Sequence, residues 1–178
     1  MKFNKIVIVG GGSAGWMAAA TLIKAYPKND ITLIESPNAP ILGVGESTLG
    51  QINNWLRYLG IEDDEFIKAT NGSYELSIRF QDFYKKNSGG FHYPFGEPHL
   101  RNTNAGLNDW VFKKILEPSL SSSDYADTFF SSMALVNANK YTESTDNKLP
   151  GFKPRKHVAY HFDAVKFGQF LKNNYFLN

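Results

Sequence analysis

The sequence contains no cysteine, and this absence excludes several kinds of site at once. Disulfide bonds, thiolate metal sites, iron–sulfur clusters and cysteine nucleophiles all need that side chain. A large charge of one sign is also lacking, because 19 basic and 17 acidic residues leave a net charge of +2. Such a balance predicts neither a nucleic-acid binder nor an acidic tail.

The N-terminus lacks a long apolar run. Ile6–Val9 is only four residues long and is followed by three glycines. A signal peptide needs roughly 7–15 apolar residues and a membrane helix about 20. We therefore expect a soluble, cytoplasmic protein that does not associate with membranes.

The chain does have the length for one folded core, since 178 residues fall within the usual size of a domain. Aromatic residues make up 15 % of it. That content suits packing around a flat ligand or a large partner surface.

The first fifty residues predict a βαβ unit. Lys5–Val9 is a run without alternation, which is typical of a strand buried on both faces of a parallel sheet. A helix is expected over 13–26, and a second apolar strand follows at Ile31–Ile34. The crossover should be right-handed, so the two strands should run parallel.

Beyond residue 50 the sequence indicates helices, one strand and loops. Between Tyr74 and Gln81 apolar and polar residues alternate, which indicates a half-buried strand. Asp163 is a candidate N-cap for a final helix. Other helices are expected at 49–59, 63–69, 107–117 and 125–136, and loops at 43–48, 83–98 and 142–154.

A glycine-rich turn joins the first strand to the first helix. Gly10, Gly12 and Gly15 have the G-x-G-x-x-G spacing, and Ser13 and Ala14 lie between the last two. The first glycine permits a tight turn, the second lets a diphosphate approach the backbone, and the third brings helix and strand together. The diphosphate then binds to the free N–H groups at the positive end of the helix.

Glu35 follows the second strand, 20 residues after Gly15. A carboxylate at this position accepts a hydrogen bond from a ribose hydroxyl of a dinucleotide. The same carboxylate disfavours a 2′-phosphate, so NADP is less favoured than FAD or NAD. The motif itself does not distinguish FAD from NAD.

More specific segments follow the glycine turn. Trp16 comes directly after the last motif glycine, and residues 43–48 read Gly-Val-Gly-Glu-Ser-Thr. Together with the glycine turn, these segments resemble the start of the flavin-dependent tryptophan halogenase family. Further matches cover 59–65, 71–74, 91–96 and 160–164, so the resemblance spans nearly the whole chain.

The resemblance implies an α/β chain with a Rossmann-like FAD/NAD(P)-binding fold of the flavin-monooxygenase type, incomplete, with an α-helical and loop insertion. Its parts would be a βαβ unit at 1–50, helices, a strand and the insertion at 51–155, and a motif with a terminal helix at 156–178. It also implies FAD as the cofactor, reduced by a separate flavin reductase. Oxygen and halide then give hypohalous acid, which halogenates an electron-rich aromatic substrate such as tryptophan.

The resemblance places Gly45, Glu46 and Ser47 near the flavin, with Glu46 as a candidate catalytic residue. The alternative for Glu46 is a structural carboxylate that caps the helix expected at 49–59. Ser47 or Thr48 could cap that helix equally well.

The family has a catalytic lysine in the strand after an Asn-x-x-aromatic segment, where it hydrogen-bonds or carries the oxidant. Residues 71–74 match that segment, which puts Glu75 at the lysine position. An ionised glutamate can only accept hydrogen bonds and would repel halide. Glu75 therefore serves a different reaction, or Lys68 or Lys85 takes the role, or the site is not catalytic. Arg79, about 13 Å along the strand, could supply positive charge, and a solvated structural carboxylate is the plain alternative.

Histidine spacing gives no metal site. Only His157 and His161 are four residues apart, and the residues between them do not form a metalloprotease pattern. Nucleophile elbows, P-loops and calcium loops are also missing from the sequence.

Family members are much longer than this chain, which therefore resembles an N-terminal fragment or split gene product that is inactive alone. A doubly wound sheet takes later strands from distant sequence, so we expect missing neighbours and an exposed apolar face. A separate C-terminal portion is a candidate partner. Two other functions stay open: a flavin monooxygenase without halide chemistry, and a non-catalytic FAD-binding subunit that requires a partner.

Overall fold

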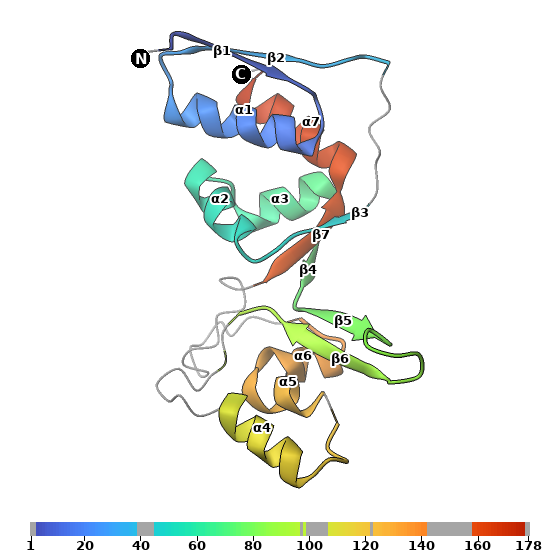
Figure 1. Cartoon of the computed structure of the whole chain (residues 1–178). Coiled ribbons are helices and arrows are strands. Elements are labelled where there is room, and N and C mark those ends of the chain that lie inside the picture. Colours follow the sequence, from blue (N-terminus) through green and yellow to red (C-terminus); the bar gives the residue numbers. More distant parts are fainter. Residues whose placement is uncertain are drawn as a thin grey trace. The chain divides into compact units, whose positions relative to one another are not determined.

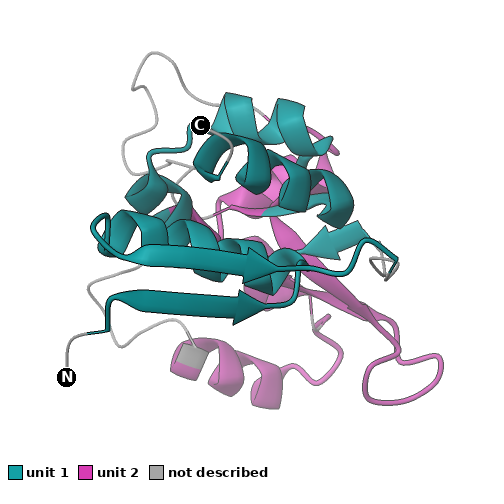
Figure 2. Ribbon diagram, turned by 90° about the horizontal axis from the view of Figure 1, so that it is seen from above, with its two compact units in different colours: residues 1–48, 54–73, 160–178 teal, residues 49–53, 74–159 magenta. Residues whose placement is uncertain are grey.

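The computed structural model describes residues 3–38, 45–96, 98, 107–121, 123–141 and 158–176. The chain divides into two compact units (Figure 1, Figure 2). The first comprises 1–48, 54–73 and 160–178, and the second comprises 49–53 and 74–159. The loop predicted at 142–154, and the first two residues of the loop predicted at 43–48, lie outside the described residues. None of the helices described is both long and apolar enough to cross a membrane.

The first unit opens with the predicted βαβ arrangement. It consists of β1 (Lys5–Val9), α1 (Ser13–Ala25) and β2 (Asp30–Ile34). The two strands pair in parallel along their whole length, with Lys5 opposite Asp30, and Figure 2 shows them side by side. The prediction of two parallel strands around a helix is confirmed.

Only one face of this sheet is covered by the described part of the chain. Ile6 and Ile8 are half-buried on that face, whereas Val7, Val9 and Ile34 on the other are 59 %, 82 % and 53 % exposed. The prediction of a strand buried on both faces is therefore wrong for this chain, because helices pack against one side only. The prediction of an exposed apolar face is confirmed.

The core of the first unit lies between its helices. α7 (Ala164–Tyr175) packs against α1 and against α3 (Asp63–Thr70), as Figure 1 shows. Phe66 is fully buried at the centre. Its ring makes edge contacts with the rings of Tyr160, Phe162, Phe167 and Phe170. Aromatic residues here pack against one another, and such pairs add to the stabilisation that burial alone gives.

The helix predicted at 49–59 begins later than expected, since α2 runs from Ile52 to Leu59. Its Trp55 donates a hydrogen bond from Nε1 to Oγ1 of Thr21 over 2.8 Å. The polar atom of a half-buried tryptophan is thus satisfied, and α2 is tied to α1.

Residues predicted as a loop form part of a small sheet. β3 (Gly45–Ser47) pairs antiparallel with β7 (Ala159–Asp163), and β4 (Ser73–Glu75) lies on the other side of β7. The loop prediction at 43–48 is therefore wrong for 45–47. The reason is that β3 gains its hydrogen bonds from a strand more than a hundred residues away, which a local pattern does not reveal.

The strand predicted from Tyr74 to Gln81 is divided at Leu76. The carbonyl oxygen of Leu76 accepts a hydrogen bond from the N–H of Phe95 over 2.9 Å, and β5 (Ser77–Gln81) starts after it. One continuous strand is therefore a wrong prediction, although both pieces are extended.

The second unit contains a β-hairpin where a loop was expected. β5 pairs antiparallel with β6 (Gly90–Pro94), so the loop prediction at 83–98 is wrong for 90–94. Phe80 lies opposite Phe91, and their rings stack with centroids 5.2 Å apart. Cross-strand aromatic pairs of this kind stabilise a hairpin that glycine and proline make hard to recognise in sequence.

Helices complete the second unit. α4 (Leu107–Leu116) confirms the helix predicted at 107–117. In the first unit, α3 likewise confirms the helix predicted at 63–69. The helix predicted at 125–136 is two helices, α5 (Asp124–Phe129) and α6 (Ser132–Asn137), because Phe130 between them is extended.

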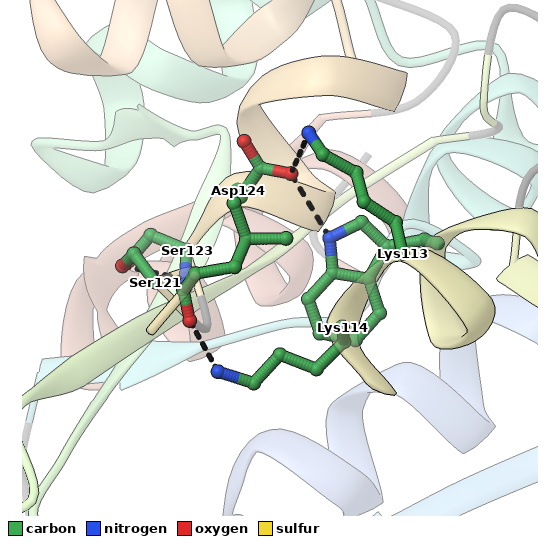
Figure 3. Close-up of polar contacts among 7 residues, drawn as sticks. Lys113, Lys114, Ser121, Ser123 and Asp124 are labelled. Atoms are coloured by element: carbon green, nitrogen blue, oxygen red, sulfur yellow. Dashed lines mark hydrogen bonds and ion pairs between the residues drawn. The ribbon is translucent and has the colours of Figure 1, made fainter. Parts of the chain in front are cut away.

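α4 and α5 are joined through one carboxylate (Figure 3). Oδ2 of Asp124 accepts a hydrogen bond from Nε1 of Trp110 over 3.1 Å, and Nζ of Lys113 lies 3.5 Å from the same oxygen. Nζ of Lys114 donates to the carbonyl oxygen of Pro118 over 2.7 Å, which closes the C-terminal end of α4.

Candidate functional site

The three motif glycines in the turn between β1 and α1 differ in backbone conformation and in the space around them. Gly10 has a φ of +122°, which L side chains rarely adopt. A β-carbon on Gly15 would lie 1.9 Å from the carbonyl oxygen of Gly10. A β-carbon on Gly12 would meet no described atom within 4 Å. The turn is therefore open over Gly12, whereas Gly15 has no room for a side chain and Gly10 has a backbone conformation that favours glycine.

The N-terminus of α1 faces this opening without a side chain of its own. Gly12 is the N-cap, no side-chain hydrogen bond caps the helix there, and its first turn contains no acidic residue. Ser13 and Ala14 begin that turn. Uncapped N–H groups and the helix dipole favour an anion at such an end. The turn therefore fits a diphosphate.

The carboxylate of Glu35 lies against the same turn. Its Oε2 is 2.2 Å from the position that a β-carbon on Gly11 would take, so only glycine at position 11 leaves room for it. Its Oε1 accepts a hydrogen bond from Nζ of Lys172, on α7, over 2.7 Å. A hydrogen-bond acceptor is thereby present where the ribose of a dinucleotide is expected.

A second feature of the first unit is an open pocket of about 510 Å³. Gly45 of β3 lines it together with the C-cap of α3, the start of β4, and residues of β7 and α7, namely Asn71, Ser73, His161, Phe162, Asp163 and Val165. Oδ1 of Asp163 accepts from the backbone N–H groups of Val165 and Lys166 over 2.9 and 3.1 Å. This confirms Asp163 as the N-cap of α7.

Glu46 and Ser47 lie on β3 beside this pocket, opposite Phe162 and His161 of β7. Oγ1 of Thr48 accepts a hydrogen bond from the N–H of Tyr160 over 3.0 Å. The capping alternative is wrong for Thr48, because that hydroxyl bonds β7 and α2 begins four residues later.

Glu75 belongs to the second unit, at the end of β4. Its Oε2 atom is buried, so the alternative of a solvated carboxylate on a polar strand face is wrong for this oxygen. Arg79 lies on β5 opposite His92, beyond the break at Leu76, and the two residues do not share one continuous strand.

The lysines that could replace the family's lysine are both exposed. Lys68 lies in the last turn of α3, and Lys85 lies in the turn between β5 and β6.

Metal-binding clusters of three or more acidic or histidine side chains do not occur among the described residues. His161 is described, whereas His157 lies outside that part of the chain.

Comparison with known proteins gives a family for this arrangement. The family model of tryptophan halogenases matches residues 5–175. The chain belongs to the tryptophan halogenase family. The α/β architecture is accordingly an incomplete Rossmann-like fold of these enzymes.

Individual relatives and solved structures match almost the whole of this chain. Tryptophan 7-halogenase RebH from Lentzea aerocolonigenes is 32 % identical over 96 % of the chain and 34 % of its own length. The apo structure of VirX1 has a TM-score of 0.87 and 39 % identity, covering 99 % of this chain and 34 % of its own. The structure of tryptophan 6-halogenase SttH from Streptomyces toxytricini has a TM-score of 0.76 and 31 % identity, covering 96 % and 32 %. The chain thus spans about a third of the length of these three proteins.

Two residues of the glycine turn site were not predicted from the halogenase-like sequence. Gly11 is the x between the first two glycines of the G-x-G-x-x-G motif, so the motif assigns it no role. The adjacent pair Gly10 and Gly11 could nevertheless have indicated that position 11 also requires glycine. Lys172 is 137 residues from Glu35 in the chain, and nothing in its local sequence marks it.

Proposed function

We propose that this chain is the FAD-binding N-terminal part of a flavin-dependent, halogenase-like oxidoreductase. The observation that carries the proposal is the glycine turn, which is open over Gly12 and faced by an oxygen of Glu35. FAD offers a diphosphate for the helix end and a ribose hydroxyl for the carboxylate. Similarity to structures described as flavin-dependent halogenases, from Xanthomonas campestris and a Brevundimonas species, supports FAD over NAD.

Different residues of the first unit bind different parts of FAD in this proposal. The adenosine diphosphate end binds to the turn and the first helical residues, Gly10, Gly12, Ser13, Ala14 and Gly15. Glu35 holds the ribose, and Gly45, Glu46 and Ser47 approach the flavin. When bound, reduced FAD supplies the reaction with oxygen that oxidises halide.

The proposed partners follow from the same family. They are a separate flavin reductase, halide, oxygen and an electron-rich aromatic such as the tryptophan named in the relatives' descriptions. We assign residues 1–50 to the dinucleotide-binding unit, 51–155 to helices, strand and insertion, and 156–178 to the terminal motif and helix.

Titration of the full chain with FAD tests this function, with flavin fluorescence as the readout. We expect saturable binding, and we expect Gly12→Asn to weaken it by at least about tenfold, because the new side chain occupies the open face of the turn. Flavin that stays bound to Gly12→Asn with unchanged affinity would overturn the proposal.

Glu75 favours a second candidate, a flavin monooxygenase without halide chemistry. A carboxylate with one buried oxygen repels halide and cannot donate a hydrogen bond to hypohalous acid unless it is protonated. The assay supplies reduced FAD and an indole substrate with and without bromide, and mass spectrometry identifies the product. A brominated product from the wild type contradicts this candidate.

Two variants at position 75 sharpen that assay. Glu75→Lys restores a donor amine, whereas the control Glu75→Gln removes the charge without adding one. If Glu75 is what prevents halide chemistry, brominated product rises with Glu75→Lys and not with Glu75→Gln.

The exposed side chains of Val7, Val9 and Ile34 favour a third candidate, an FAD-binding subunit that requires a partner for catalysis. Exposed apolar patches of this kind mark interaction surfaces. Product formed by the 178-residue chain alone contradicts this candidate.

A further inference from the structure

The two oxygens of the Glu35 carboxylate have different neighbours. Oε1 is bound by Nζ of Lys172 at 2.7 Å. Oε2 lies over the backbone of Gly11, 2.2 Å from the site of a missing β-carbon. Oε1 is therefore hydrogen-bonded to a residue of α7, and Oε2 faces the glycine turn, where the ribose of a nucleotide would bind.

Lys172 is itself held in place by an aromatic ring. Its Nζ lies 5.5 Å from the ring centroid of Trp16, and Trp16 is only 5 % exposed. The ring of Trp16 is fixed in turn, because it makes an edge contact with Phe176 and lies 3.3 Å from where a β-carbon on Gly168 would be. A cation–π contact of this kind restricts a flexible lysine side chain.

We propose that Lys172 is a positioning residue for the adenosine end of FAD. By binding Oε1 it fixes the rotamer of Glu35, so that Oε2 accepts the hydrogen bond from the ribose 2′-OH. Without Lys172 the side chain of Glu35 is free to rotate into solvent. FAD must then fix that side chain in one rotamer when it binds, which costs conformational entropy and lowers the affinity. This inference rests on the proposed FAD-binding function.

Gly11 supports the same geometry from the other side. A side chain at this position would collide with both Oε2 and the β-carbon of Glu35. Gly11→Ala therefore displaces the carboxylate that Lys172 holds. Gly11→Ala disturbs the contact between Lys172 and Glu35 by a steric clash, whereas a substitution of Lys172 removes one of the two partners.

The experiment compares two nucleotides that differ by one hydroxyl. Isothermal titration measures ADP and 2′-deoxy-ADP binding to the full chain, to Lys172→Met and to Lys172→Arg. Lys24→Met is the matched control, because Nζ of Lys24 also lies 5.5 Å from an aromatic centroid, that of Tyr58, but away from the turn.

We expect Lys172→Met to weaken ADP binding up to about tenfold, because the freed Glu35 side chain must be ordered again when ADP binds. Binding of 2′-deoxy-ADP should change by less than about threefold, since it lacks the hydroxyl in question. Lys172→Arg restores most of the ADP affinity, and Lys24→Met leaves both affinities unchanged.

Three outcomes would overturn the inference. Equal losses for the two nucleotides mean that Lys172 acts by general charge or through the fold. Unchanged ADP affinity in Lys172→Met refutes the positioning role while the proposed function stands. A wild-type chain that binds neither ADP nor FAD refutes the proposed function and this inference with it. Circular dichroism checks folding, and Gly11→Ala supplies the same nucleotide comparison if Lys172→Met does not fold.

Discussion

The carbonyl oxygen of Gly10 occupies the space that a side chain on Gly15 would need. The separation from a β-carbon at position 15 would be 1.9 Å, far inside van der Waals contact. The atom in the way belongs to the backbone, so it cannot rotate aside as a side chain could. The end of strand β1 packs closely against the first turn of helix α1 at this point. This close packing places the N-terminus of the helix at the open side of the glycine turn.

We therefore expect Gly15→Ala to separate β1 from α1. Overpacking of this kind costs typically about 1–3 kcal/mol of unfolding free energy, and the diphosphate site should be lost with it. Urea denaturation followed by circular dichroism measures the stability, and FAD titration measures the site. A variant as stable as the wild type, with normal FAD affinity, would show that the turn tolerates a side chain there.

Gly12→Asn should weaken FAD binding without destabilising the fold. Gly12 has an extended backbone with φ −78°, and it is the N-cap of α1, a position where asparagine is among the preferred residues. Unfolding free energy should stay within about 0.5 kcal/mol of the wild type. FAD affinity should fall by at least about tenfold, because the amide fills the open face and competes for the helix N–H groups. Loss of stability in this variant would contradict the open geometry.

Local sequence was sufficient to predict the βαβ unit and its glycine turn. The strands β1 and β2 are short apolar runs, and Gly10 and Gly15 stand where backbone geometry leaves no alternative. The residues at 45–47 could not be assigned in this way, because their strand exists only through pairing with β7. Lys172 was missed for the same reason, since its contact with Glu35 is made across the fold.

Two further errors also have physical causes. The alternation from Tyr74 to Gln81 is real, yet Leu76 turns its carbonyl to Phe95 and divides the strand. The hairpin strand β6 was hidden by its glycine and proline residues, whose usual preference for turns is outweighed by the stacking of Phe91 on Phe80. Cross-strand contacts decided both cases.

Asp163→Ala should destabilise the first unit through its last helix. Asp163 supplies both capping hydrogen bonds at the N-terminus of α7, and loss of such a cap costs about 0.5–2 kcal/mol. Urea denaturation measures the loss. Asp163→Asn is the matched control, because asparagine keeps a side-chain oxygen that caps equally well. Equal destabilisation by both substitutions would assign the effect to the carboxylate charge rather than to the cap.

Tyr175 should make stability fall at high pH. Its hydroxyl donates to the carbonyl oxygen of Leu59 over 3.2 Å, and burial, followed by the negative charge of Glu65, raises its pKa above the usual 10.0. In the unfolded chain the tyrosine ionises near pH 10.0, while the folded chain still holds it neutral. The contribution to stability is therefore complete below pH 10.0 and is lost as pH rises through the folded-state pKa.

Measurement of unfolding free energy between about pH 8 and pH 11 checks this sign. The decline with pH should be shallower in Tyr175→Phe, because phenylalanine has no proton to lose. Tyr84→Phe is the matched control, since Tyr84 is 90 % exposed. Parallel pH profiles for Tyr175→Phe and the wild type would mean that Tyr175 does not contribute, and the decline would then have to come from other groups that titrate in the same range.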